Sequence, residues 1–188
     1  MADNGSPPKP AADAADREWV RAAVARFERP LISYAAHLAG GLDVGRDVAQ
    51  ETFVRLCSAD RAQVEGRLAQ WLFTVCRNLA IDYRRKERRM SLFNPETETE
   101  TFASDGPSPD DAAERDDSVS LVLRRLGELP PVQQEVVRLK FQHGLSYRQI
   151  GEVLNLTPTN VGFLLHTAIK SLRTKLTDPA DAPARGRS

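Results

Sequence analysis

Apolar residues recur with a helical period along most of the chain. In the first such segment Trp19, Ala23 and Phe27 repeat every four residues, and Gly40 and Gly41 end it. Segments with this period cover residues 17–41, 45–57, 68–89, 118–129, 130–144 and 145–176. No convincing alternation of apolar and polar residues, as in a strand, interrupts them. The pattern therefore predicts an all-α protein.

Three stretches lack this periodicity and divide the chain. Residues 1–16 contain neither aromatic nor β-branched residues, so we expect a disordered tail, and residues 177–188 form a second tail. Residues 90–117 carry nine acids against one base, with three prolines and one glycine. Such a segment repels itself, which predicts a flexible acidic linker. We therefore expect two small helical domains, residues 17–89 and 118–176.

The composition argues against several classes of protein. The 188 residues hold 26 acids and 26 bases, so the net charge indicates no partner. Cys57 and Cys76 lie on apolar helical stretches and are expected to be buried thiols, and no His or Cys has the spacing of a metal site. No signal peptide and no apolar run of the ~20 residues that span a bilayer is evident. We expect a cytoplasmic protein without cofactor, metal or membrane insertion. Since no catalytic constellation appears, we expect no enzyme.

The end of the third helical segment is strongly basic. Residues 77–89 contain six bases against Asp82 and Glu87, next to the aromatic Tyr83. The bases are Arg77, Arg84, Arg85, Lys86, Arg88 and Arg89. Such a cluster suits neutralisation of phosphates and stacking on unpaired bases. It equally suits a solvated helix end whose cations complement the helix dipole, and the residues alone favour neither interpretation.

The last helical segment, residues 145–176, has the outline of a helix-turn-helix. The inward positions of its first helix are Ile150, Val153 and Leu154. Asn155 and Leu156 form the turn. Thr157 is the expected N-cap of the second helix, with Pro158 at its first helical position.

The second helix of this motif is amphipathic but poor in charge. Its core stripe comprises Val161, Leu165, Ala168 and Leu172. Its opposite face carries Thr159, Phe163, His166, Thr167, Lys170 and Arg173. No Lys or Arg occurs between Thr157 and Ile169, which is unusual for a helix that reads DNA. The question is whether this face meets bases or a protein.

Three segments of the chain together carry a family resemblance. They are "RDVAQETFVRL" at 46–56, "WLFTVCRNLAIDYRRK" at 71–86 and "LPPVQQEVVRLKFQHGLSYRQIGEVLNLTPTNVGFLLHTAIKSLR" at 129–173. In this order they resemble the group IV, or extracytoplasmic-function, sigma-70 RNA polymerase sigma factors. The resemblance implies a subunit that binds core RNA polymerase and directs transcription initiation at the −10 and −35 promoter elements.

The resemblance also implies roles for residues of the first domain. Contact with the β′ clamp coiled coil of the polymerase falls to Asp47, Gln50, Glu51 and Arg55. Contact with the −10 DNA falls to Arg77, Asn78, Asp82, Tyr83, Arg84, Arg85 and Lys86. Residues 58–67 match the loop that captures a flipped −10 base in the family, but this segment is short and no base-reading residue stands out.

The second domain is expected to read the −35 element and to touch the β flap. The residues assigned to −35 DNA are Lys140, Arg148, Thr157, Thr159, Asn160, Phe163, His166, Thr167, Lys170 and Arg173. Members of the family usually have Lys, Ser and Arg where this chain has Gly162, Phe163 and Leu164. We expect Phe163 to meet thymine methyl groups, while the polar side chains reach base edges and the cations reach phosphates. The alternative is that Phe163 packs against a protein.

The linker is long enough for both promoter elements to be held at once. Elements about 25 base pairs apart are separated by roughly 85 Å along the duplex. Twenty-eight extended residues reach about 95 Å at most. The acidity of the linker suits either a stand-in for nucleic acid inside the polymerase or simple solubility.

Control of the protein is expected to act on its contact with the polymerase. The stretch "DVGRD" at 43–47 has Val44 and Arg46 where the family commonly has carboxylates. Phosphorylation of Thr52, or less favourably Ser58, by a Ser/Thr kinase would restore negative charge. The other route is an anti-sigma factor held between the two domains. The alternative to a sigma factor is a sigma-like decoy that titrates such an inhibitor.

Overall fold

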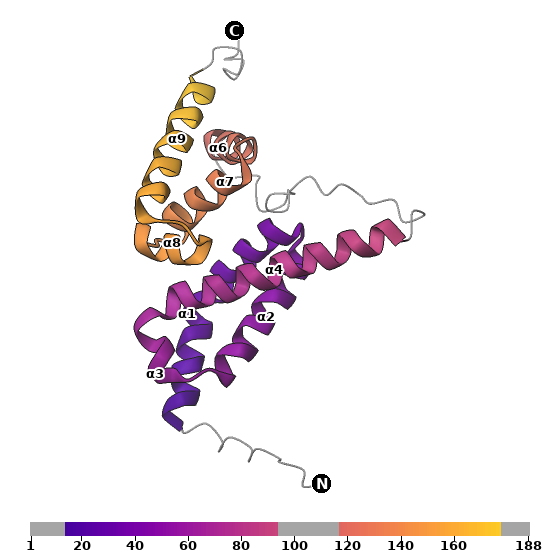
Figure 1. The fold of residues 1–188 in the computed structure, drawn as a ribbon, viewed down its shortest axis with the longest axis vertical. Coiled ribbons are helices and arrows are strands. Elements are labelled where there is room, and N and C mark those ends of the chain that lie inside the picture. The colour runs from indigo at the N-terminus through magenta and orange to yellow at the C-terminus, as the bar shows by residue number, and fades with distance from the viewer. Residues whose placement is uncertain (1–13, 94–116, 178–188) are drawn as a thin grey trace.

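The computed structural model describes residues 14–93 and 117–177, and its regular elements there are helical (Figure 1). The first part contains α1 (Ala14–Ala39), α2 (Leu42–Ser58), α3 (Arg61–Val64), η1 (Glu65–Arg67) and α4 (Leu68–Phe93). The second contains α6 (Asp117–Gly127), α7 (Pro131–Val137), η2 (Arg138–Gln142), α8 (Tyr147–Leu154) and α9 (Pro158–Leu176). The prediction of an all-α protein is confirmed. The predicted tails and linker lie largely outside the described residues.

Several element boundaries differ from the predicted ones. α1 begins at Ala14, inside the expected tail, and α4 continues to Phe93, four residues into the expected linker. Residues 58–67, expected as a loop, include the short helices α3 and η1. Asp60 caps α3, since its carboxylate accepts a hydrogen bond from the Ala62 N–H. Helix ends depend on such local caps, which apolar periodicity does not report.

The first module packs α1, α2 and α4 around one apolar core. Its most deeply buried side chains are Leu31, Tyr34, Leu56, Leu72, Phe73 and Cys76. Cys76 is buried as predicted, whereas Cys57 is exposed, which contradicts the prediction of two buried thiols. The buried stripe of α2 runs through Val48, Thr52 and Leu56, so position 57 is rotated out of it.

The second module builds the predicted helix-turn-helix from α8 and α9. Ser146 and Gln149 form a capping box at the start of α8. Asn155 ends α8 with a φ of 56°, in the left-handed region that asparagine tolerates. The Thr157 hydroxyl accepts a hydrogen bond from the Asn160 N–H, and Pro158 occupies the first turn of α9. The motif is therefore confirmed down to its caps.

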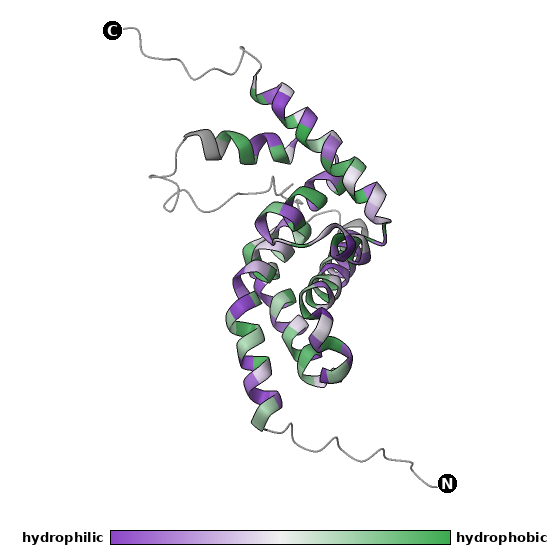
Figure 2. Cartoon of the chain, turned by 90° about the vertical axis from the view of Figure 1, so that its left-hand side faces the viewer, coloured by the Kyte–Doolittle hydropathy of each residue, from purple (hydrophilic) through white to green (hydrophobic). Residues whose placement is uncertain are grey.

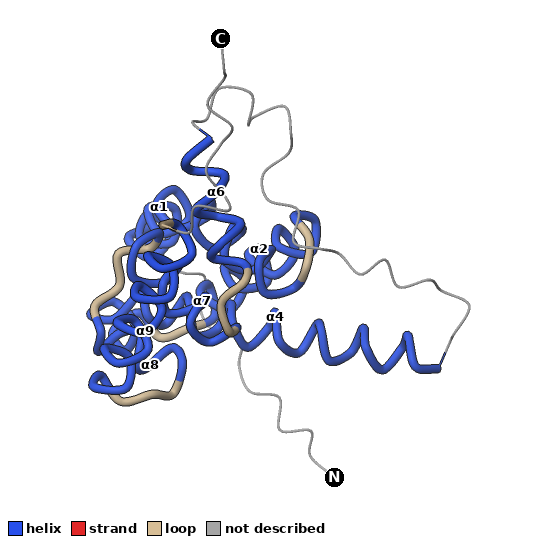
Figure 3. Tube along the Cα trace, turned by 90° about the horizontal axis from the view of Figure 1, so that it is seen from above, coloured by secondary structure: helices blue, strands red, loops and turns tan. Residues whose placement is uncertain are grey.

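The two modules touch each other. α8 packs against the first half of α4, and the second half of α4 projects away from the bundle (Figures 1 and 3). In Figure 2 the helices carry apolar and polar residues side by side, as amphipathic helices do. Of the helices described, none combines the length and hydropathy needed to cross a membrane.

A close approach of α1 and α2 generates the first prediction. A Cβ atom on Gly45 would lie 2.8 Å from the Ile32 carbonyl oxygen and 2.9 Å from the Ala36 Cβ. We expect Gly45→Ala to lower the free energy of unfolding by about 1–3 kcal/mol, because backbone atoms cannot yield cheaply. Urea unfolding measures this. Gly66→Ala is the control, since a Cβ there meets nothing within 4 Å. Equal stability of the two variants would contradict the tight contact.

Candidate nucleic-acid interface

The projecting half of α4 presents its cations to solvent. Residues 82 to 90 are all exposed, among them Arg84, Arg85 and Lys86, and the ring of Tyr83 is 41% exposed. The other half of the same helix is anchored in the core by Leu72, Phe73, Cys76 and Ala80. One continuous helix therefore holds these cations in fixed positions relative to the core, which suits a rigid grip on phosphates.

Residues expected to act together at the −10 DNA are divided by the structure. Asn78 is exposed on the anchored half of α4, and Asp82 is exposed with the cations of the projecting half. Arg77 instead faces the second module, where its Nε donates to Glu135 Oε1 at 2.6 Å and its Nη2 to Oε2 at 3.4 Å. The guanidinium of Arg77 is thus engaged within the chain.

Glu135 is a buried carboxylate that joins α7 to two helices of the first module. It is 5% exposed, and the Tyr34 hydroxyl on α1 also donates to its Oε1 at 2.6 Å. Burial, and then the charge of Glu135, raises the pKa of Tyr34 well above its ordinary value. Tyr34 is therefore a protonated donor here. Sequence reasoning missed this site because its partners are 101 and 58 residues apart.

His143 completes the contact between the modules. Its ring lies against Phe73, with centroids 4.8 Å apart, and against Tyr34 at 5.8 Å. Both ring nitrogens are buried without a hydrogen-bond partner. Burial, with a smaller contribution from the Arg138 charge, lowers the pKa of His143 from 6.5 to about 4. The imidazole is therefore neutral at pH 7.

The residues assigned to the polymerase clamp share the exposed side of α2. Asp47, Gln50, Glu51 and Arg55 are all exposed, and Arg55 Nε pairs with Glu51 Oε1 at 3.1 Å. Beside them lies an open, largely apolar hollow between α1 and α2. Its lining includes Val20, Val24, Ile32, Phe53, Val54 and Cys57. Sequence reasoning missed the hollow, although an apolar Val54 outside the buried stripe was a signal for it.

Phosphorylation of Thr52 is contradicted by its surroundings. The side chain is fully buried, and its hydroxyl donates to the Val48 carbonyl oxygen at 2.7 Å. A kinase needs an accessible hydroxyl, and two added charges would have no solvation there. The hypothesis rested on the scarcity of carboxylates in residues 43–47, which says nothing about the burial of Thr52.

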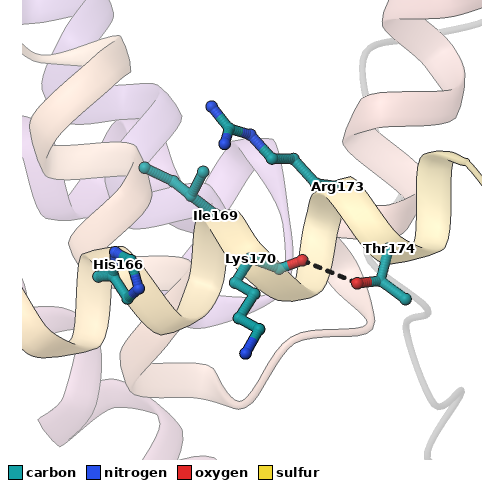
Figure 4. Close-up of a pocket in the computed structure, with 5 residues that line it drawn as sticks. All are labelled: His166, Ile169, Lys170, Arg173 and Thr174. Carbon is teal, nitrogen blue, oxygen red and sulfur yellow. Dashed lines mark hydrogen bonds between the residues drawn. The ribbon is translucent and has the colours of Figure 1, made fainter.

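The outer face of α9 collects most of the residues assigned to the −35 DNA. Thr159, Asn160, His166, Lys170 and Arg173 are exposed, Thr167 is half-buried, and Phe163 is 66% exposed. Figure 4 shows His166, Lys170 and Arg173 along a shallow hollow of this helix, beside Ile169 and Thr174. The hollow combines an apolar floor with cationic edges, which suits a sugar–phosphate strand.

Three other residues assigned to this surface have different surroundings. Thr157 is exposed, but its hydroxyl caps α9. Arg148 on α8 is 86% exposed and lies 3.5 Å from Glu152. Lys140 on η2 is half-buried, with its Nζ donating to the Leu145 carbonyl at 3.4 Å and lying over the Tyr147 ring. Lys140 therefore supports the motif from inside, and Tyr147, which was not predicted, is the more exposed neighbour.

No metal centre accompanies these surfaces in the described part of the chain, where no three His, Cys, Asp or Glu side chains are grouped to hold an ion. The candidate sites are binding surfaces built from cations, aromatic rings and amides.

Family models match both helical parts of the chain. The model of sigma-70 region 2 matches residues 23–90, and that of sigma-70 region 4 matches residues 120–172. The ECF RNA polymerase sigma factor SigW of Bacillus subtilis is 30% identical over 147 residues, covering 74% of this chain and 79% of the relative. The ECF RNA polymerase sigma factor SigL of Mycobacterium tuberculosis is 30% identical over 169 residues, covering 88% and 93%.

Solved structures with the same fold include two complexes. The sigma factor RpoE of Bartonella quintana, crystallised with the anti-sigma factor NepR, matches with a TM-score of 0.67 and 19% identity, covering 86% of this chain and 99% of that one. CnrH in complex with the cytosolic domain of CnrY matches with a TM-score of 0.59 and 23% identity, covering 88% and 91%. At these identities the likeness shows the fold.

The buried imidazole of His143 predicts a loss of stability in acid. An unfolded His143 binds a proton near pH 6.5 and the folded one only near pH 4, so stability is complete above pH 6.5 and falls as the pH drops toward 4. The full loss is roughly 3 kcal/mol, at about 1.4 kcal/mol per pKa unit. We expect His143→Phe to make this part of the pH dependence of the melting temperature about half as steep, because His37, whose pKa burial also lowers to about 4, remains.

The control for an added phenylalanine is His166→Phe, on the exposed face of α9. A His143→Phe variant whose melting temperature falls with acid as steeply as that of the unmodified chain would contradict the neutral buried ring.

Proposed function

The chain belongs to the extracytoplasmic-function family of sigma-70 RNA polymerase sigma factors, and we propose that it carries core RNA polymerase to promoters by holding their −10 and −35 elements. Sigma factors direct transcription initiation by binding. The observation that carries the proposal is the pairing of a projecting cationic helix with a fully capped helix-turn-helix on one chain. We propose two working domains, residues 17–89 and 118–176, joined by the acidic linker 90–117.

The projecting half of α4 is the proposed −10 grip. Arg84, Arg85 and Lys86 neutralise phosphates on either side of the melted segment. The exposed ring of Tyr83 offers a face on which an unpaired base can stack, an interaction worth about 1–3 kcal/mol. Asn78 and Asp82 supply acceptors and a donor for base edges.

The outer face of α9 is the proposed −35 reader. Phe163 meets thymine methyl groups, and Asn160 and Thr159 near the helix start reach base edges. Lys170 and Arg173 anchor phosphates further along the same helix. A decoy that only titrates an inhibitor would need no cationic −10 helix, so the exposed cations of α4 favour initiation.

The exposed side of α2 is the proposed dock for the β′ clamp coiled coil. Asp47, Gln50, Glu51 and Arg55 supply charges and amides, and the adjacent apolar hollow at Phe53 and Val54 supplies area to bury. The β flap is the expected partner of the second domain. An anti-sigma factor is the expected inhibitor, and the cytoplasm, where the polymerase is, the expected compartment.

Run-off transcription with bacterial core polymerase tests the function. We expect the chain to direct initiation from a matching promoter, and the Arg84→Ala/Arg85→Ala/Lys86→Ala variant to lose tenfold or more of this activity while still binding the core enzyme. Its DNA affinity should also depend less on salt, by about 0.9 in the logarithmic slope for each phosphate that is no longer neutralised.

The matched control for the triple variant removes three exposed arginines of α1, Arg17, Arg21 and Arg29. It changes the net charge equally, on a different helix. Failure of the unmodified chain to bind core polymerase would refute the proposed function, and equal losses in both triple variants would refute the assignment to α4.

Phe163 tests how the −35 element is read. We expect Phe163→Ala to weaken protection of the −35 region in a footprint roughly tenfold while −10 protection remains, because alanine is too short to reach the thymine methyl group. Phe141→Ala is the control, since Phe141 is also exposed, at 63%, but lies on η2. Unchanged −35 protection would mean that Phe163 contacts protein.

A further inference from the structure

The contact between the two modules is built around one buried carboxylate. Glu135 on α7 takes hydrogen bonds from Tyr34 on α1 and from Arg77 on α4. Tyr34 is 1% exposed, and the side chain of Arg77 is 25% exposed. A second polar link joins Gln70 on α4 to Glu152 on α8. Polar and charged side chains therefore hold the two modules together at these points.

The contact also has an aromatic part, because the His143 ring lies 4.8 Å from the Phe73 ring and 5.8 Å from the Tyr34 ring between centroids. Phe73 and Tyr34 are each 1% exposed, so their exposure to water on separation would be unfavourable. In a buried ion pair the Coulomb attraction is largely offset by the loss of hydration, and both ions are well solvated once apart. The Arg77–Glu135 pair thus gives the closed form a defined geometry and itself adds little to the free energy of separation, while the buried rings oppose opening.

The closed form is incompatible with the promoter-bound form on two grounds. While Arg77 pairs with Glu135, its Nε and Nη2 are not available to a phosphate. With α8 packed on α4, the two DNA surfaces also cannot lie the roughly 85 Å apart that elements about 25 base pairs apart require.

We propose that the Tyr34–Arg77–Glu135 contact is an autoinhibitory latch: it holds the free chain closed, and it opens before the two modules can occupy a promoter. The latch is intramolecular and needs no second protein to form. An inhibitor or the polymerase would act on it by favouring the closed or the open form.

Cations of both modules explain why Glu135 is the sensitive element of the latch. Arg77 reaches it from α4, and Arg138 follows it by one helical turn. Arg138 also lies close enough to His37 on α1 and to His143, which follows η2, to lower the pKa of both. Without the carboxylate, the partly buried guanidinium of Arg77 would lose its ion-pair partner.

Substitutions at Glu135 test the latch on the full chain. Glu135→Gln keeps the shape but removes the charge, and Glu135→Lys places a like charge opposite Arg77. Small-angle scattering should show a radius of gyration that rises from the unmodified chain to the Gln variant and again to the Lys variant. We expect the ratio of open to closed molecules to increase roughly tenfold or more.

The matched controls are Glu128→Gln and Glu128→Lys. Glu128 is an exposed acid with two cationic partners, Arg125 and Lys175, inside the second module. These variants should leave the radius of gyration unchanged. Circular dichroism checks that all four variants keep their helix content. A milder variant, Tyr34→Phe, keeps the ring and removes one hydrogen bond to Glu135.

The inhibitory consequence rests on the proposed function and has its own readout. At limiting protein, Glu135→Gln should raise the initial rate of run-off transcription severalfold over the unmodified chain. Folded Glu135 variants that stay as compact as the unmodified chain would overturn the latch. Opening without a rise in rate would overturn its inhibitory role, and a chain that opens yet directs no transcription in any form would overturn the proposed function as well.

Discussion

The carboxylate of Glu135 fixes how the two halves of the molecule meet. It is buried at the point where α7 meets α1 and α4. A buried carboxylate has lost its hydration, so it needs hydrogen-bond donors from the protein in place of water. The donors to Glu135 come from α1 and α4, so these bonds fix α7 against the first module. In the same arrangement α8 packs on α4, and the outer face of α9 is exposed. The arrangement of the recognition surfaces therefore depends on a few polar contacts.

α4 connects stability with function because it belongs to both. Its first half contributes Leu72, Phe73 and Cys76 to the core, and its second half carries exposed cations beyond the bundle. Because α4 is long and continuous, its second half is held in a fixed position relative to the core. The cations are thereby preorganised, and less conformational entropy is lost when they meet phosphates than if they lay on a loop.

Local signals in the sequence were enough for the helices and for the helix-turn-helix. Thr157, Pro158 and Asn155 act through their immediate neighbours, and so their roles could be predicted from spacing. α2 shows where this reasoning stops. Its buried stripe contains the polar Thr52 and excludes the more apolar Cys57, so residue type alone placed Cys57 in the wrong surroundings.

The contact between the modules was beyond local reasoning of any kind. Tyr34 and Glu135 are 101 residues apart, and neither has a neighbour whose spacing points to the other. Arg77 was grouped with the −10 cations because it stands beside them in sequence. The Arg77 side chain is directed toward Glu135 of the second module, and sequence periodicity carries no information about this contact.

The low charge of α9 is consistent with its proposed place in a tethered pair of DNA grips. A single reader that binds DNA alone needs many phosphate contacts, because these supply most of its affinity. A second grip on the same chain needs fewer, since the first grip raises its effective concentration near the −35 element. In the proposed −35 reader, Phe163 and Asn160 would then contribute discrimination more than affinity, and a weakly held second module would exchange between DNA and the proposed closed form. Strong cations on this face would favour the DNA-bound form at every site. They would weaken both the discrimination between sites and the exchange with the closed form.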